Sequence, residues 1–90
     1  MRRRGRPFGT EVVTPPEVRR IFDELGTQLL ATRRARHLSI DALSELACVS
    51  NMTVRRGEHP ADYPRYLGLH SLAKICNALG CDIVIVPRRR

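Results

Sequence analysis

The sequence predicts a mainly α-helical fold, a bundle of four to five helices followed by a short C-terminal β-strand. Apolar residues recur at steps of three and four over most of the 90-residue chain, which is the period of helices with one buried face. Glycine, proline, serine and threonine interrupt this period where helices would begin and end. Residues 82–86 differ, because after one aspartate they form an uninterrupted β-branched run, as strands do.

The length and the charge distribution bound the organisation of the chain. A chain of 90 residues forms one small core with a thin stability margin, so we expect a homodimer. The formal net charge is +7 and residues 7–87 are neutral, so the whole excess lies in two arginine-rich ends. We divide the chain into a basic arm (residues 1–13), a helical domain (14–80) and a strand with a basic tail (81–90).

Basic ends that lack acids favour binding to the phosphate backbone of a nucleic acid. A membrane surface could attract the same ends, but neither is an amphipathic helix and no apolar run approaches transmembrane length. The arm contains Arg4, Gly5, Arg6 and Pro7, which resemble the core of an AT-hook. In that family the run lies in the narrow minor groove of A·T-rich DNA, where the negative potential attracts arginine. A generic arm on the DNA backbone is the alternative.

A helix is expected from residue 14 to about residue 36. Thr14 suits its N-cap, proline follows where no backbone amide is needed, and Glu17 can complete a capping box. Five apolar residues share one face of this helix: Val18, Ile21, Phe22, Leu25 and Leu29. Gly26 either divides the helix or lies within one long helix. The helix ends in three arginines, Arg33, Arg34 and Arg36. They either compensate the helix dipole or contact DNA phosphates.

Residues 38–58 predict two short helices joined by a tight turn. Ser39 suits the N-cap of the first helix. An apolar stripe of this helix comprises Leu43, Leu46 and Ala47. Ser50 suits the N-cap of the second helix, residues 50–57, in which Val54 points inward. The other side chains of the second helix point away from the core: Asn51, Met52, Thr53, Arg55 and Arg56.

These outward side chains are of the types that read base edges in duplex DNA. Arginine can donate two hydrogen bonds to guanine O6 and N7, and asparagine can pair with adenine in the same way. Methionine, or the methyl group of threonine, can contact the methyl group of thymine. The spacing is that of a helix-turn-helix, so we expect residues 50–57 to enter the major groove.

A loop and a closing helix are expected next. Gly57 would end the preceding helix, and Gly80 would cap a helix that begins near residue 67. We expect Tyr63 and Tyr66 to pack over the loop rather than to stack on bases, because duplex recognition makes little use of stacking.

The strand after this helix contains four apolar residues, Ile83, Val84, Ile85 and Val86. A lone strand would leave its backbone amides and carbonyls unpaired, so it must find a partner. That partner is either the equivalent strand of a second chain, across a two-fold axis, or residues 10–13 of either chain. We favour the first.

The remaining polar residues indicate neither a metal site nor an enzyme. Cys48, Cys76 and Cys81 form no CxxC pair, and a zinc site from His70 with the last two matches no common ligand spacing. We expect buried, reduced thiols and no cofactor. Paired carboxylates, a Ser-His-Asp order and a phosphate-binding loop are all missing from the sequence. The first nine residues lack the apolar segment of a secretory signal, so we expect a cytoplasmic protein.

From residue 25 to residue 79 the chain resembles the Cro and lambda-repressor family of helix-turn-helix regulators, the xenobiotic-response-element type. The resemblance is carried by Leu25-Gly26, Arg33-Arg34-Ala35-Arg36, Leu38-Ser39, Leu43, Glu45-Leu46-Ala47, Val49-Ser50, Thr53-Val54 and Glu58. The residues that it implies as base readers are Asn51, Met52, Thr53 and Arg56. Those that it implies as phosphate contacts are Ser50 and Arg55. The chain departs from the family at Ile40 (usually glutamine), Cys48 (usually glycine) and Gly57 (usually large and apolar).

The end of the chain adds a second resemblance. Leu79-Gly80 followed by an apolar strand is similar to antitoxin repressors of persistence-type toxin–antitoxin modules, in which such strands join two subunits. We therefore expect a dimeric, sequence-specific repressor that binds double-stranded DNA, either of phage type or a small bacterial regulator, in a bacterial cell or phage-infected host. The alternative is an antitoxin that regulates its own operon and also binds a toxin protein.

Overall fold

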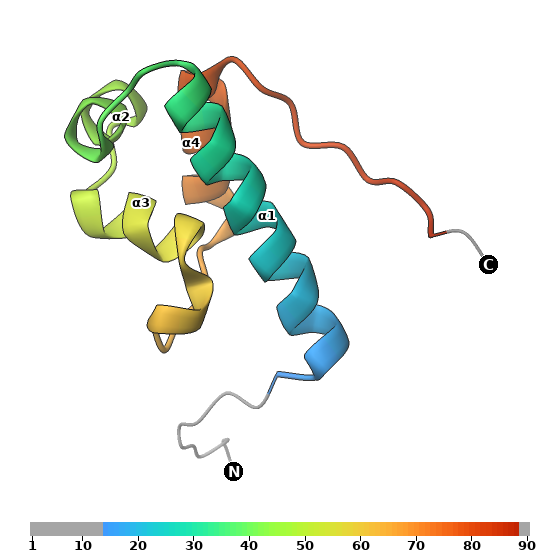
Figure 1. The fold of residues 1–90 in the computed structure, drawn as a ribbon. Helices are drawn as coiled ribbons and strands as arrows, with labels where there is room; N and C mark the ends of the chain where they lie inside the picture. The colour runs from blue at the N-terminus through green and yellow to red at the C-terminus, as the bar shows by residue number, and fades with distance from the viewer. Residues whose placement is uncertain (1–13, 89–90) are drawn as a thin grey trace, which may run out of the picture.

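The computed structural model describes residues 14–88, and this part of the chain is mainly helical (Figure 1). Its elements in order are α1 (Pro16–Ala35), α2 (Ile40–Ala47), α3 (Asn51–Glu58), the short 3-10 helix η1 (Pro60–Asp62) and α4 (Leu69–Leu79). The long α1 packs mainly on α3, and α2 packs on both α3 and α4. The predicted mainly α-helical class and the order of the helices are confirmed. The N-terminal arm with its AT-hook-like run lies outside the described residues.

The start of α1 differs from the sequence expectation. The helix begins at Pro16, with Pro15 as N-cap, and within the described chain no side chain caps it. The carbonyl of Pro15 instead accepts hydrogen bonds from the amides of Val18 and Arg19, both at 3.0 Å. The capping role expected of Thr14 is therefore wrong. Proline at the first helical position fixes φ near the helical value and has no backbone N–H that would need an acceptor. The helix can therefore start without a side-chain cap.

Gly26 does not divide α1, which is continuous over 20 residues. It is buried where α1 meets the end of α3. A Cβ built on Gly26 would lie 2.7 Å from the carbonyl oxygen of Glu58 and 2.9 Å from that of Gly57. Real Cβ atoms do not approach backbone oxygens so closely, so the glycine allows two helix backbones to touch.

We expect Gly26→Ala to lower the free energy of unfolding by about 2–3 kcal/mol, because two backbones must move apart to admit the methyl group. Urea denaturation followed by circular dichroism measures this loss. Gly68→Ala is the matched control, since among the described atoms nothing lies within 4 Å of its added Cβ. The control should cost no more than about 1 kcal/mol. Equal losses in the two variants would contradict the close approach of α1 and α3.

Three helices end in the same way, with one residue in the left-handed region. These residues are His37 (φ 57°), Cys48 (φ 57°) and Gly80 (φ 72°). In each turn the next amide donates back to a carbonyl five residues earlier: Leu38 to Arg33, Val49 to Ser44 and Cys81 to Cys76. The cap expected at Gly80 is confirmed, and Cys48, which stands where the resembled family usually has glycine, has the positive φ that glycine tolerates best. A residue with a Cβ costs about 1–2 kcal/mol in the left-handed region. His37 and Cys48 bear this cost, whereas Gly80 does not.

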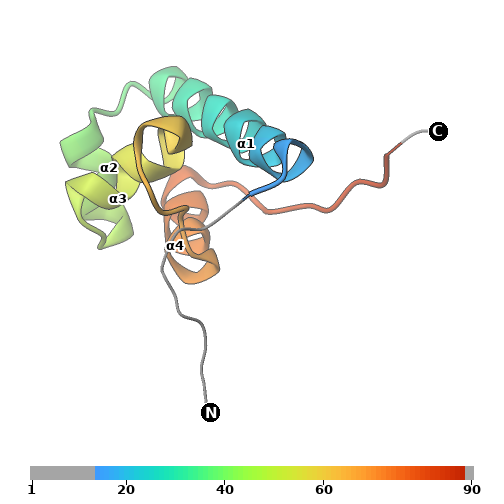
Figure 2. The ribbon, with the colours of Figure 1, turned by 90° about the horizontal axis from the view of Figure 1, so that it is seen from below.

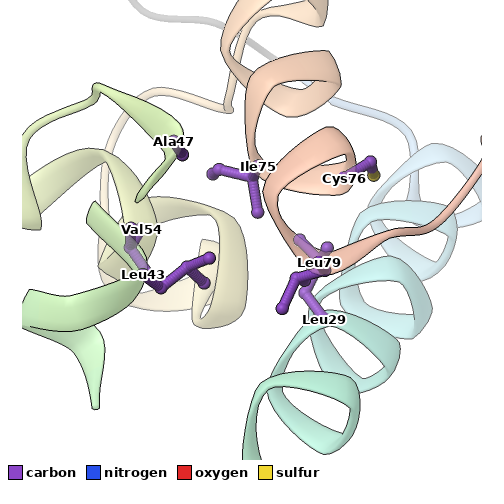
Figure 3. Packing of buried hydrophobic residues seen from close by; sticks show 7 residues of the cluster. All are labelled: Leu29, Leu43, Ala47, Val54, Ile75, Cys76 and Leu79. Atoms are coloured by element: carbon purple, nitrogen blue, oxygen red, sulfur yellow. The ribbon is translucent and has the colours of Figure 1, made fainter. Parts of the chain in front are cut away.

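The core lies between all four α-helices (Figure 3). Its buried apolar residues are Leu29, Leu43, Ala47, Val54, Ile75, Cys76 and Leu79. Ile75 of α4 points towards Ala47 of α2. Helix α4 packs mainly on α2 and also contacts α1 and α3. The inward positions predicted for Leu43 and Val54 are confirmed. Leu46 was expected in the same stripe but is 60 % exposed, so it lies outside the buried face that Leu43 and Ala47 form.

The end of α3 also differs from expectation. Gly57 was predicted to terminate the helix, yet α3 continues to Glu58 and His59 follows as its C-cap. Gly57 is buried, and a Cβ there would lie 2.9 Å from Cδ2 of Leu67 and 3.4 Å from Cδ1 of Leu29. The missing side chain therefore makes room for neighbouring leucines.

Residues 81–88 leave the bundle after α4 as an extended segment, and Figures 1 and 2 both show it running away from the helices. Its apolar side chains are exposed, reaching 92 % at Ile85. Within residues 14–88 no strand is present, so the predicted β-strand does not form in the isolated chain. Strand formation requires a hydrogen-bonding partner, and the single chain supplies none to this segment within its described residues. Residues 10–13, the other expected partner, lie outside those residues.

Candidate nucleic-acid interface

Two serine caps and one turn fix the orientation of α3 relative to α2. Ser39 Oγ accepts from the Ala42 amide at 3.0 Å, and Ser50 Oγ accepts from the Thr53 amide at 3.1 Å. Both predicted N-caps are confirmed. The carbonyl of Cys48, inside the turn, accepts from Nζ of Lys74 on α4 at 3.2 Å. The turn is thus held by hydrogen bonds within itself and by a side chain from α4.

The inner face of α3 is anchored by an ion pair with α1. Glu58 is buried, and its carboxylate accepts from Nε of Arg33 at 2.6 Å and from Nη2 at 3.1 Å. Nη1 of Arg33 donates to the carbonyl of Leu38 at 2.8 Å. All three guanidinium nitrogens therefore have partners inside the protein.

This ion pair corrects the role predicted for Arg33. Arg33 was expected to contact phosphate, but its guanidinium is almost wholly covered and serves to neutralise Glu58. Glu58 entered the sequence analysis only as part of a resemblance. Its position four residues after Val54 places both on one helical face, and that spacing could have indicated a buried carboxylate in need of a cation.

The other two arginines at the end of α1 differ from each other. Nε of Arg36 donates to the carbonyl of Leu79 at 2.5 Å, which ties the ends of α1 and α4 together. The side chain of Arg34 is exposed and makes no hydrogen bond with any residue in 14–88. Arg36 keeps an exposed side chain as well, so these two remain candidates for phosphate contact.

The outer face of α3 presents Met52, Arg55 and Arg56, whose spacing of three and four residues places them together. Met52 is 46 % exposed and Arg55 is exposed. Arg56 is half-buried, and its Nε is fully covered without a hydrogen-bond partner in the part of the chain that the structure describes. Thr53 is half-buried beside them, and its hydroxyl lies 2.8 Å from that of Ser50.

Asn51 connects α3 with α2 at the edge of this face. Its Nδ2 donates to Oδ1 of Asp41, and its Oδ1 accepts from Nε of Arg55 at 2.6 Å. Sequence reasoning missed Asp41, which lies ten residues away on the other side of the turn and has no partner at helical spacing. The structure therefore brings the predicted residues to one surface and adds a carboxylate to it.

All three cysteines were expected to be buried, but only one of them is. Cys48 is exposed in its turn, Cys81 is partly covered, and Cys76 lies in the core. Burial, and next the nearby Cys81, raise the pKa of the Cys76 thiol above its ordinary value. The Cys76 thiol is therefore held in its neutral, unreactive form, which suits a core residue.

Three further observations concern metal binding, membrane spanning and similarity to known proteins. Residues 14–88 contain no cluster of three or more histidine, cysteine or acidic side chains placed to hold a metal ion. None of the described helices combines the length and the apolarity that crossing a membrane requires. A scan against protein-family models and a search of curated proteins each find no match to this chain.

Proposed function

We propose that the chain is a sequence-specific repressor that binds duplex DNA with α3 in the major groove. One observation carries the proposal. The inner face of α3 is locked into the core through Val54, Gly57 and Glu58, while its outer face offers Met52, Arg55 and Arg56 to solvent. A short helix held rigidly with such an exposed face fits the width of the major groove and the pattern of donors and methyl groups there.

The surrounding residues suit phosphate contacts on either side of this helix. At the α3 N-terminus the backbone amides of Asn51 and Met52 have no hydrogen-bond acceptor among residues 14–88, so these amides and the hydroxyl of Ser50 can donate to a phosphate. Arg34 and Arg36 at the end of α1 supply positive charge, whereas Arg33 is excluded by its ion pair. No step of this proposal uses a cofactor or a catalytic group.

The proposal is tested by selecting bound duplexes from a random pool with the full chain at near-physiological salt. We expect enrichment of one site with two-fold symmetry, whose half-site centres lie one helical turn, about 34 Å, apart. A bound pool in which no duplex sequence is enriched would contradict it.

The basic arm should add affinity without strong sequence choice. Deleting residues 2–6 removes four arginines, and we expect the slope of log K against log salt to become shallower by as much as about 3 to 4. Binding measured at several salt concentrations gives this slope. A selective loss of preference for A·T-rich flanks would instead support the minor-groove arm, and an unchanged slope would exclude the arm from binding.

We further propose that the exposed segment 83–86 pairs with its copy in a second chain. Its four consecutive apolar side chains are exposed and its backbone groups pair with nothing in residues 14–88, which is costly in water. A two-fold strand pair would cover the side chains and satisfy the backbone groups. Ile85→Lys places a positive charge on the most exposed of the four apolar residues of segment 83–86. We expect it to weaken dimerisation at least tenfold by analytical ultracentrifugation. The control Asn77→Lys, on the exposed side of α4, should leave the dimer intact, and a monomeric wild-type chain would exclude the pairing.

The same exposed segment is the observation that favours the second candidate, an antitoxin that regulates its own operon. In that function the apolar run could contact a toxin protein in addition to a second copy. Co-expression with the products of neighbouring genes distinguishes the two functions. A stable heteromeric complex supports the antitoxin, and a homodimer alone supports the repressor.

A further inference from the structure

The amide group of Asn51 is already occupied by protein partners. Its Nδ2 donates to Asp41 and its Oδ1 accepts from Arg55. A bidentate contact with adenine would need both of these atoms at once. Both side-chain atoms that Asn51 would use to read adenine are therefore engaged within the protein. This argues against a direct base-reading role for Asn51.

Arg55 keeps the part of its guanidinium that reads guanine. The side chain is exposed, its Nε is held by Asn51 at 2.6 Å, and its terminal nitrogens make no hydrogen bond to another described residue. These two nitrogens carry four of the five N–H donors of the group. They form the fork that reaches guanine O6 and N7 together.

We infer that Asp41, Asn51 and Arg55 form a relay in which Arg55 reads a guanine and Asn51 is its positioning residue. This inference rests on the proposed function and refines it, because it assigns base reading to Arg55, which the resemblance implied as a phosphate contact, and positioning to Asn51. The geometry of the relay is directional. A carboxylate only accepts, so Asp41 must face the Nδ2 of Asn51, and this leaves Oδ1 to face the donor Nε of Arg55.

The relay would act before DNA arrives. Arginine has many rotamers, and holding its Nε in the free protein removes part of the entropy that ordering the side chain would otherwise cost on binding. Asp41 also places a negative charge at the interface, and this charge repels the DNA phosphates. On duplexes without the guanine, no base contact offsets that repulsion. The relay should therefore raise sequence preference more than it raises affinity.

The test is competition binding between duplexes that carry each of the four bases at each position of the selected site. Arg55→Ala should reduce the preference for one guanine roughly ten- to hundredfold, the range for loss of a bidentate contact. Asn51→Ala and Asp41→Ala should weaken that same preference by about three- to tenfold, since the reading group remains but is no longer held. Asp41→Asn retains an oxygen acceptor and should restore most of the preference while binding to non-specific duplexes becomes tighter.

Arg65→Ala is the control for lost charge, since Arg65 is exposed in the loop outside the relay. It should lower affinity for all duplexes alike and leave every base preference unchanged. If Asn51→Ala abolishes preference for an adenine at another position, the relay is overturned while the repressor function stands. If Asn51→Ala changes only thermal stability, the three residues merely brace α2 against α3 and the relay is also overturned. A wild-type chain without base preference removes the proposed function and the relay with it.

Discussion

Glu58→Ala is expected to lower the free energy of unfolding by about 3–5 kcal/mol, the loss typical of breaking a buried ion pair from one side. The side chain of Glu58 is about 1 % exposed and that of its partner Arg33 about 11 %. Removing the acid leaves a covered guanidinium with one remaining acceptor, the carbonyl of Leu38. For a domain of this size the loss is a large share of total stability. Urea denaturation followed by circular dichroism measures it.

Two companion variants separate the ion pair from other effects. Glu45→Ala removes an exposed acid from α2 and should change the free energy of unfolding by no more than about 0.5 kcal/mol. The double variant Arg33→Met, Glu58→Leu replaces the pair with apolar groups of similar size and should recover much of the loss. A loss below about 1 kcal/mol in Glu58→Ala would mean that the pair is not desolvated in solution.

Reversing both arginines on α3, Arg55→Glu together with Arg56→Glu, should weaken binding to the selected site by about 3–6 kcal/mol. Each reversal removes a base or phosphate contact and adds repulsion from the DNA backbone. Fluorescence anisotropy with a labelled duplex at fixed salt measures the change. Arg56 is half-buried, so Arg55→Glu alone serves as a second variant in which folding is undisturbed.

The matched control is Arg19→Glu together with Arg20→Glu, an identical change in net charge. Both arginines are exposed on the N-terminal part of α1, which extends beyond the α2–α3 pair (Figure 1). Because exposed charges more than about 10 Å apart are largely screened at 0.1 M salt, the control should cost no more than about tenfold in affinity. Equal losses for both double variants would show that net charge, not the outer face of α3, determines binding.

The helices and the small core were readable from the sequence because they depend on local patterns. The spacing of Leu43 and Val54, the serine caps of α2 and α3, and Gly80 after α4 each act within a few residues, and the structure confirms them. Thr14 and Gly57 were misread for a related reason. The prolines after Thr14 were read as support for a cap at Thr14, although they can start the helix without it. The close approach of Gly57 to Leu67 joins residues ten positions apart, so no helical period indicates it.

The interactions that were missed join residues far apart in the chain. Arg33 and Glu58 are separated by 25 positions, and Asn51 and Asp41 by ten, so no periodicity within one helix could pair them. From the sequence, any arginine of the cluster before a helix-turn-helix could contact phosphate or pair with a buried acid. Only the fold shows which arginine faces inward. The segment 83–86 presents the opposite problem, because strand formation needs a hydrogen-bonding partner and residues 14–88 supply none to it.

The most direct test of α3 in the major groove is protection of a selected site from dimethyl sulfate by the full chain. This reagent methylates guanine N7 in the major groove and adenine N3 in the minor groove. If α3 reads base edges, guanine N7 should be protected in two clusters one helical turn apart, and Arg55→Glu with Arg56→Glu should remove that protection. Protection confined to adenine N3, or none at either atom while the complex remains bound, would contradict it.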